Sequence, residues 1–337
     1  MANNTTSTSG LTDHFQPVIN KKLLDYAVQA LKLDQFADKA TLPKNAGSKV
    51  IRFFQYGEPS AANVLAMTEG DASAGPAAAA NYRVLEMTTV DATLTQLGEV
   101  IGVTDLMSAT DLLGTMKQAT VTAGQDAALK ADTLIRDELV TSTSGESDSR
   151  TKRYSGSANT TWAELAADSA VTANFTAVDL LDGCTNLKIN RAPQIDGGYV
   201  AVVPPEVSRD LMNDDDWLEA HKYSDVKPLY KGEAGSLHGV RIVEATNSHR
   251  EAGASGAKGT FAAAGNIFST IITGANSYGV PALAGDSPMS PKIVVADTPD
   301  KSDPLNQLTT IGFKLFYVAK ALNTNWFIIH RSKSAYA

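Results

Sequence analysis

Two stretches separated by a segment of small residues decide the fold prediction: Val50-Ile-Arg-Phe-Phe-Gln-Tyr56, and Tyr82–Leu97, which is rich in Val, Met, Thr and Leu. β-Branched and aromatic residues of this kind favour extended strands. Between them, residues 57–81 hold few large apolar side chains, several Gly and Pro, and the run Gly75-Pro-Ala-Ala-Ala-Ala80. This pattern predicts a protruding two-stranded arm with a tip of small residues. Because an isolated hairpin is only marginally stable in water, the arm should need a partner.

A long helix is predicted directly after the arm. Thr104 is a suitable N-cap, and apolar residues recur at helical spacing from there to about Val140. The expected buried face consists of Ala109, Leu113, Met116, Ala123, Ala127, Ala131 and Leu134. At 1.5 Å per residue this helix would be roughly 54 Å long, which few compact domains require. Since the face is mostly alanine, it should lie close against a sheet or a neighbouring backbone.

The rest of the chain alternates between helices and strands, which makes the predicted fold class α+β. The predicted helices are Val18–Lys32, Thr176–Asn190 with Leu180, Cys184 and Leu187 on one side, and one opened by Pro204-Pro205. The predicted strands are Tyr199–Val203, Val240–Glu244, Ile267–Ile272, Lys292–Ala296, Phe313–Ala321 and Trp326–His330. Asn323-Thr-Asn325 predicts that the last two strands form a hairpin.

Composition narrows the class of function. The 337 residues include 29 basic and 37 acidic side chains, a net charge of −8, which argues against gripping nucleic acid through a basic face. A single cysteine, Cys184, excludes an intrachain disulfide and a zinc site with several thiolates. The N-terminus has neither a basic start nor an apolar run, so no secretory signal is expected. The late apolar stretch Gly312–Ile329 is interrupted by Lys314 and Lys320, so we expect a soluble chain without a membrane span.

Catalytic signatures are absent from the sequence, and the nearest approximations favour simpler interpretations. Gly253–Thr260 superficially resembles a phosphate loop, but Lys258 precedes Gly259 where a phosphate loop has the reverse order, which favours a flexible surface loop. Asp214-Asp215-Asp216 could hold a divalent cation, yet adjacent carboxylates point in different directions. Their position just before Trp217 favours the start of a helix.

The five histidines share no ligand spacing and are predicted to be ordinary surface or interface residues: His14, His221, His238, His249 and His330. Cys184 lies on an apolar helical face, which favours a buried small hydrophobe over a reactive thiol. We therefore expect neither a catalytic site nor a metal or cofactor site.

Several segments, in order along the chain, resemble the N4-like major capsid proteins of tailed bacteriophages. They are Leu65-Ala-Met-Thr-Glu-Gly70, Tyr199-Val-Ala-Val-Val-Pro-Pro-Glu-Val207, Arg209-Asp-Leu-Met-Asn-Asp-Asp-Asp-Trp-Leu-Glu-Ala-His-Lys-Tyr-Ser-Asp225, Gly232-Glu-Ala-Gly-Ser-Leu-His-Gly-Val-Arg-Ile-Val-Glu244 and Asp303-Pro-Leu-Asn-Gln307. The similarity runs from about Asp13 to the C-terminus. No single segment is diagnostic, but the ordered set is fairly specific.

The resemblance implies the Hong Kong 97-type capsid fold. Its parts would be an N-terminal arm (1–48), an E-loop (49–104), a peripheral domain (105–198) with a spine helix (105–143), an axial domain (199–290) and C-terminal strands that return to the peripheral domain (291–337). The implied function is a non-enzymatic major capsid protein whose hexamers and pentamers form an icosahedral shell around double-stranded DNA. The implied location is the virion capsid, assembled in the host cytoplasm, with portal, scaffolding and decoration proteins as further candidate partners. DNA should make only weak, non-specific contacts.

One departure from the fold's prototype concerns the arm. No lysine occurs between Lys49 and Lys117, so the isopeptide cross-links that the prototype forms from E-loop lysines are not available here. The shell should therefore be held non-covalently. The subunit-interface candidates are Thr68, Glu69, Gly70, Asp71, Gly75 and Pro76. Glu69 is the candidate for a charge-assisted contact with an Arg or Lys of the next subunit, with a solvated turn residue as the alternative.

Two other functions stay open at this level. The same fold serves encapsulin compartments, which package enzymes in place of genomes. A soluble enzyme or ligand-binding protein is disfavoured because no catalytic constellation is found. The size of the assembled particle would separate a shell from a soluble enzyme, and a portal partner or a protein cargo would separate the two kinds of shell.

Overall fold

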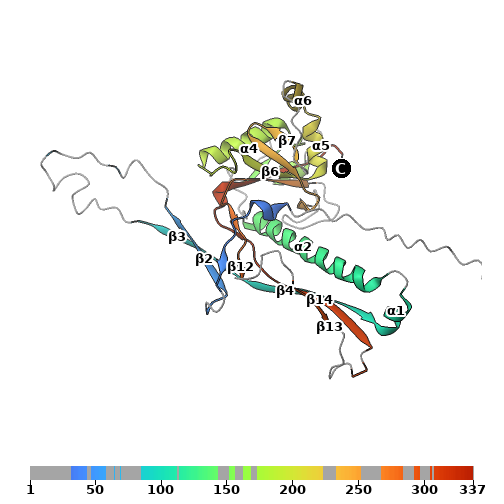
Figure 1. Cartoon of the computed structure of the whole chain (residues 1–337). Helices are drawn as coiled ribbons and strands as arrows, with labels where there is room; N and C mark the ends of the chain where they lie inside the picture. The colour runs from blue at the N-terminus through green and yellow to red at the C-terminus, as the bar shows by residue number, and fades with distance from the viewer. Residues whose placement is uncertain are drawn as a thin grey trace, which may run out of the picture. The chain divides into compact units, whose positions relative to one another are not determined.

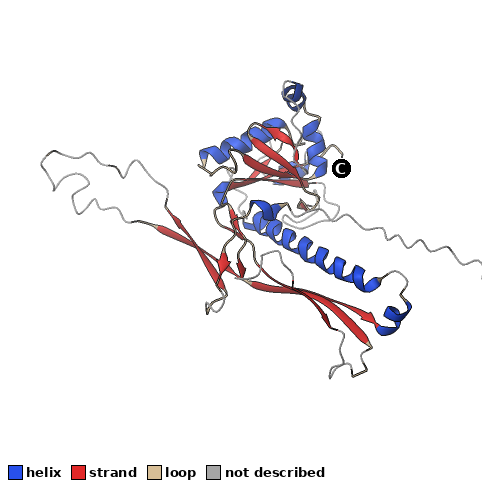
Figure 2. Cartoon of the chain, viewed as in Figure 1, coloured by secondary structure: helices blue, strands red, loops and turns tan. Residues whose placement is uncertain are grey.

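The computed structural model describes residues 32–43, 47–57, 64, 69, 85–111, 114–142, 152–155, 162–167, 173–222, 233–251, 267–283, 292–296, 304–305 and 307–336. They form a mixture of helices and strands (Figures 1 and 2). The chain divides into a smaller unit (1–28, 99–125, 293–313) and a larger unit (29–98, 126–292, 314–337). The predicted helix Val18–Lys32 lies outside the described residues except for Lys32, and the predicted loop Gly253–Thr260 lies outside them entirely.

The larger unit is built on a seven-stranded mixed sheet. Its main path is β5 (Lys152–Tyr154), β16 (Phe327–Ser332), β10 (Ile267–Thr273), β6 (Tyr199–Val203), β8 (Val240–Glu244) and β7 (Glu233–Leu237), with β9 (Arg250–Glu251) paired to β10. The β6–β8 and β5–β16 pairs are parallel, whereas the other pairs are antiparallel. Every residue of β6, β10 and β16 is buried, as expected for central strands covered on both faces.

One face of this sheet is covered by α4 (Ala177–Ile189) and α5 (Pro205–Met212), followed by α6 (Asp215–Lys222). The shared core contains Leu180, Cys184 and Leu187 of α4, Val207 and Leu211 of α5, Trp217 of α6, and Phe268, Ile272 and Ile328 of the strands. Thr176 caps α4 in a capping box with Asp179, and Pro205 occupies the first turn of α5. These helix predictions are confirmed.

A close approach between α4 and the sheet depends on Gly183. A Cβ atom at this position would lie 2.5 Å from Cδ1 of Ile272 on β10. A larger residue at this position would force the Ile272 side chain to move, so the absence of a side chain at Gly183 permits the present packing.

The predicted long helix is present but interrupted, so the prediction of one continuous element over 105–143 is wrong. Thr104 caps a short helix, α1 (Asp105–Thr110), whose Met107 amide donates to the Thr104 hydroxyl at 3.3 Å. Gly114 then has φ +80°, which a right-handed helix cannot contain. The Asp111 carboxylate accepts a hydrogen bond from the Thr115 amide, and this contact begins α2 (Thr115–Ser142).

The buried face of α2 repeats every four residues and consists of Ala119, Ala123, Ala127, Ala131, Ile135 and Leu139. The alanines at 123, 127 and 131 were predicted to lie on this face, and the prediction is confirmed. Ala109 was also expected there but is exposed on α1, because the break separates the two helical registers. Met116 and Leu134 are half-buried, and Leu113 lies outside the described residues.

The predicted hairpin of the last two strands is wrong. β14 (Leu308–Tyr317) pairs with β13 (Lys292–Ala296) and β4 (Thr95–Thr104), whereas β16 pairs with β10 and β5. Between them, β15 (Lys320–Ala321) pairs with β11 (Tyr278–Gly279), and Thr324–Trp326 forms a 3₁₀ turn, η6. The six side chains of β16 are all buried, so this strand lies beside the central strand β10.

The predicted two-stranded arm is confirmed as a pair of antiparallel strands, β2 (Val50–Tyr56) and β3 (Met87–Thr93), in the larger unit. The ladder runs from Val50 opposite Thr93 to Tyr56 opposite Met87, and the Gly57 amide extends it to the Glu86 carbonyl at 3.0 Å. The predicted strand Tyr82–Leu97 is two strands, because the chain leaves β3 at Leu94 and continues as β4 in another sheet.

Three short elements complete the larger unit: η2 (Leu33–Phe36), β1 (Thr41–Leu42) and β12 (Ala282–Leu283), with β1 and β12 paired in parallel. The smaller unit contains α1, the first part of α2 and most of the sheet β13-β14-β4. α3 (Trp162–Ala167) belongs to the larger unit, where Leu165 is buried. Of the described helices, none is long and apolar enough to cross a membrane.

Two glycines of the helical region give a matched test of the break. Gly114→Ala should destabilise the isolated subunit by about 1–2 kcal/mol, because alanine is strained at positive φ. Gly124→Ala should instead stabilise it by about 0.5–1 kcal/mol, because Gly124 lies inside α2 with no atom within 4 Å of an added Cβ. Urea unfolding followed by circular dichroism measures both. A stabilising Gly114→Ala would mean that α1 and α2 are continuous in solution.

Candidate functional site

The arm formed by β2 and β3 presents two different faces, because side chains alternate along each strand. Its outer face carries Phe54, Tyr56 and Met87, which are 61%, 60% and 52% exposed. Tyr56 and Met87 are cross-strand partners, and Phe54 lies two residues away on the same face. A cluster of aromatic and sulfur-containing side chains open to solvent is typical of an interaction surface.

The same face carries an ion pair that fixes the strand register. Arg52 and Asp91 lie opposite each other, with Nε donating to Oδ1 at 2.6 Å and Nη2 donating to Oδ2 at 2.8 Å. The hydrogen bonds from Arg52 hold the pKa of Asp91 below its usual value and raise the pKa of Arg52. Because both side chains are about half exposed, solvent screens their attraction, and the bidentate geometry serves mainly to align the strands.

The inner face of the arm is anchored on its own unit through Phe53. Its ring lies against Gly279 of β11, where an added Cβ would come within 3.0 Å of Cζ and within 3.3 Å of Leu322 Cδ1. Gly279 thus leaves the space that the aromatic ring occupies. The arm therefore has one face seated on its own chain and one face carrying exposed aromatic side chains.

The interface residues predicted from the sequence fall almost entirely outside the described region. Glu69 is described and lies exposed in a turn, whereas Thr68, Gly70, Asp71, Gly75 and Pro76 are not described. The contact of Glu69 with a neighbouring subunit remains a prediction. Sequence reasoning missed Phe54, Tyr56 and Met87, although the alternation of Arg52, Phe54 and Tyr56 within one strand was a usable signal.

Two histidines contradict the prediction that all five are ordinary surface or interface residues, because they lie in the core. His249 and His330 are fully buried, whereas His238 is exposed. His14 and the side chain of His221 lie outside the described region. The burial comes from pairing between distant strands, which a single histidine in a sequence does not reveal.

His330 belongs to a buried Ser-His-Asp group that could be mistaken for a catalytic triad. Ser155 Oγ lies 2.8 Å from His330 Nε2 and donates to Asp179 Oδ2 at 3.0 Å. Asp179 Oδ1 lies 3.7 Å from Nε2, the same imidazole nitrogen that Ser155 contacts. In a hydrolase the carboxylate holds the opposite nitrogen and the serine gives its proton to the histidine. Here the serine proton is committed to Asp179, so the group links β5, β16 and α4 structurally.

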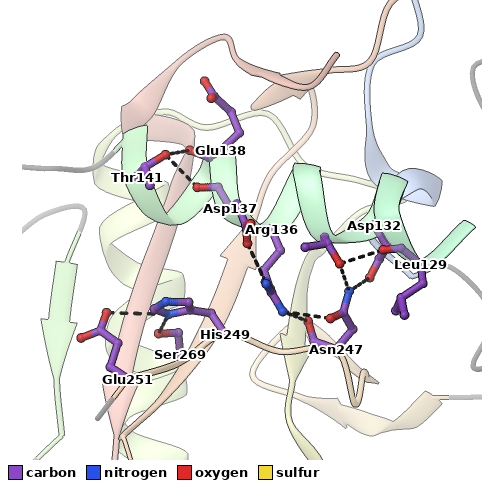
Figure 3. Close-up of polar contacts among 11 residues, drawn as sticks. Leu129, Asp132, Arg136, Asp137, Glu138, Thr141, Asn247, His249, Glu251 and Ser269 are labelled. Atoms are coloured by element: carbon purple, nitrogen blue, oxygen red, sulfur yellow. Dashed lines mark hydrogen bonds and ion pairs between the residues drawn. The ribbon is translucent and has the colours of Figure 1, made fainter. Parts of the chain in front are cut away.

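The second buried histidine lies beside an ion pair. His249 Nδ1 lies 3.2 Å from Ser269 Oγ and 3.7 Å from Glu251 Oε1, and Arg331 Nε donates to the same carboxylate oxygen at 3.0 Å (Figure 3 draws His249, Ser269 and Glu251). Burial, followed by the positive charges of Arg331 and Arg136, lowers the pKa of His249 to about 3. The imidazole is therefore neutral at neutral pH.

A third polar cluster joins three segments that are distant in sequence (Figure 3). Asp132 of α2 accepts hydrogen bonds from the Leu33 amide at 3.2 Å and from Asn247 Nδ2 at 3.1 Å. Arg136, one turn further along α2, donates to Asn247 Oδ1 at 2.9 Å. Burial raises the pKa of Asp132, although the hydrogen bonds oppose this shift. The cluster holds the segment that leads into the arm against α2.

The triple aspartate serves the start of α6, as the favoured interpretation predicted. Asp214 accepts hydrogen bonds from the Ala177 amide at 2.8 Å and from the Asp216 amide at 3.3 Å. In the described parts of the chain, no three His, Cys, Asp or Glu residues are grouped so that they could hold a metal ion. Cys184 is buried in the core, which confirms its prediction. The arm's outer face is therefore the strongest candidate functional surface.

Comparison with known proteins identifies the fold. A family model described as phage capsid protein matches residues 136–289. The capsid protein of cyanophage P-SCSP1u superposes with a TM-score of 0.67 at 16% identity, covering 99% of this chain and 97% of that chain. The chain has the phage capsid fold. The capsid protein of Ralstonia phage GP4 gives the same TM-score at 13% identity, covering 98% of both chains.

The capsid fold also occurs in a protein compartment that matches this chain. The SrpI encapsulin of Synechococcus elongatus superposes with a TM-score of 0.57 at 8% identity, covering 99% of this chain and 97% of that chain. No curated protein sequence matches the chain. The structural likenesses establish the fold, and the family match is with phage capsid proteins.

Removal of the buried imidazole of His249 should change how the free energy of unfolding depends on pH. Since the folded pKa of His249 lies below the unfolded value, stability present above pH 6.5 is lost as the pH falls toward 3. Between pH 6.5 and pH 5 this histidine should cost about 2 kcal/mol, and His249→Gln should abolish that loss. Urea unfolding of the isolated subunit at several pH values measures it. His238→Gln, at an exposed position, should keep the wild-type slope, and equal slopes for all three proteins would contradict the assignment.

Proposed function

We propose that this chain is the major capsid protein of a tailed bacteriophage, and that its copies form hexamers and pentamers of an icosahedral shell around double-stranded DNA. The observation that carries the proposal is the fold match to phage capsid proteins over almost the whole length of both chains. The family match over residues 136–289 and the exposed aromatic face of the arm support it independently.

The parts of the chain take roles in this proposal that follow the capsid fold. Residues 1–48 form the N-terminal arm, and residues 49–104, which include β2 and β3, form the E-loop. The peripheral domain covers 105–198, with α1 and α2 as an interrupted spine helix within 105–143. The axial domain covers 199–290, and the strands of 291–337 return to the peripheral domain. The chain acts in the virion capsid as a structural protein without enzymatic activity, and the shell assembles in the host cytoplasm.

Contacts between subunits are non-covalent in this proposal. Residues 50–116 contain no lysine for an isopeptide bond, and the only cysteine is buried. The outer face of the arm supplies an apolar contact with the next subunit, and Glu69 in the turn adds a charged one. The charged contact is tested with Glu69→Gln, by measuring how readily assembled capsids of this variant dissociate in salt. Portal, scaffolding and decoration proteins are further partners, and packaged DNA makes only weak, salt-sensitive contacts.

An encapsulin-like compartment is the second candidate, because the SrpI encapsulin has the same fold. The phage proposal is favoured because the phage capsids superpose more closely, with TM-scores of 0.67 against 0.57, and because the family match is with phage proteins. Cryo-electron microscopy of the purified chain tests both proposals. Closed icosahedral shells that package DNA in the presence of a phage portal support the first. Shells that enclose a protein cargo and accept no portal would favour the second, and a stable monomer would contradict both.

The arm's outer face should be required for assembly but not for folding. Phe54→Ser combined with Tyr56→Ser removes two exposed aromatic rings, so the free energy of unfolding of the isolated subunit should stay within about 0.5 kcal/mol of the wild type. The protein concentration needed for shell formation should rise about tenfold or more, because aromatic side chains dominate interface energetics. Light scattering measures the threshold. Gln55→Ser, on the inner face of the same strand, should assemble like the wild type.

A further inference from the structure

The helical layer of the larger unit carries two exposed apolar patches, one on α4 and one at α6. On α4, the solvent-facing stripe includes Val178, Leu181 and Ile189, which are 56%, 40% and 63% exposed. These positions follow the helical period, so they form one continuous face opposite the buried side of α4. At α6, Leu218 is 47% exposed and Met212, at the end of α5, is 36% exposed.

The two patches carry opposite charges. The far end of α4 presents exposed Lys188 and Arg191 beside Ile189. α6 presents exposed Asp215, Asp216 and Glu219 beside Leu218. An apolar centre with a basic rim on one surface therefore matches an apolar centre with an acidic rim on the other, as in the complementary faces of a specific interface.

One molecule cannot bring the Ile189 end of its own α4 onto its own α6. The start of α4 adjoins α6, since the Ala177 amide donates to Asp214. Ile189 lies twelve residues further along α4, which places it about 18 Å away along the helix axis. Figure 1 shows α4 and α5 over the sheet, with α6 projecting beyond them. Two different complementary patches on one subunit are what a head-to-tail contact between copies requires, and such contacts form rings when the rotation between copies closes.

We propose that the basic end of α4 docks on the acidic face of α6 in a second copy of this chain, and that this head-to-tail contact repeats around each ring of subunits. The inference rests on the proposed shell function and names the surfaces by which neighbouring copies recognise one another. Ile189 packs beside Leu218 and Met212, and Lys188 faces Glu219 across the contact. A surface ion pair is weak alone, but this one lies beside apolar contacts and recurs at every copy.

Charge reversal on each side tests the contact. Lys188→Glu and Glu219→Lys should each raise the concentration needed for assembly about tenfold, because an attractive pair becomes a repulsive one. The unfolding midpoint of each isolated subunit should change little, since both side chains are exposed. A chain that carries both substitutions keeps the wild-type net charge and restores opposite charges across the contact. It should assemble within about twofold of the wild-type threshold.

A mixture of the two single variants gives a sharper test. One variant has acidic groups on both surfaces and the other has basic groups on both, so every contact is satisfied only when the two alternate around a ring. Six-membered rings allow this alternation and five-membered rings do not. The mixture should therefore form hexamers and open sheets or tubes, seen by negative-stain microscopy, but few closed shells.

Two results would overturn the contact. In the first, the single variants assemble at the wild-type threshold. In the second, the double variant assembles no better than the single variants, which would mean that these surfaces meet something other than each other. Either result leaves the shell function intact if the wild type forms closed particles. A wild type that forms no particles would contradict the proposed function itself.

Discussion

The outer face of the arm carries apolar side chains that its own chain leaves uncovered. A two-stranded ribbon buries little apolar surface, and this one leaves Phe54, Tyr56 and Met87 more than half exposed. Phe53 anchors the inner face on Gly279, and the Arg52–Asp91 pair keeps the strands in register. The chain therefore presents an apolar surface to solvent on a ribbon whose own contacts cover only one face. Such a surface is stabilised when a neighbouring molecule covers it.

The buried polar groups of the larger unit hold together the scaffold from which the arm extends. Asp132 links the Leu33 backbone to α2 and to Asn247, so the segment that precedes the arm is tied to the longest helix. His330, Ser155 and Asp179 join β16, β5 and α4 through hydrogen bonds that a catalytic triad would direct differently. Buried polar groups cost free energy unless they are paired, and their pairing here selects one arrangement of the strands. The hydrogen bonds of these groups hold distant strands and helices of the larger unit in one arrangement.

Local patterns predicted the elements whose structure depends on nearby residues. The β-branched and aromatic residues of Val50–Tyr56, the helical spacing of apolar residues in Thr176–Asn190 and the proline at 205 each gave the correct element. The hairpin prediction failed because β16 pairs with β10, some 60 residues earlier, and the sequence contains no sign of that pairing. Gly114 marks the helix break and is visible in the sequence. The prediction followed instead the alanines that recur at helical spacing. The interface prediction rested on Glu69 in the tip, whereas the described apolar surface lies on the strands themselves, where exposure depends on how the inner face is seated.

Hydrogen exchange of the arm measures whether the two strands depend on a neighbouring subunit. The amides of Val50–Tyr56 and Met87–Thr93 should exchange rapidly in the isolated subunit, because only one face of the ribbon is covered. In assembled shells the same amides should be slowed by about a hundredfold or more, whereas those of β6 and β10 should be protected equally in both states. Equal protection of the arm in the subunit and the shell would contradict the account, because the arm would then be stable without a neighbour.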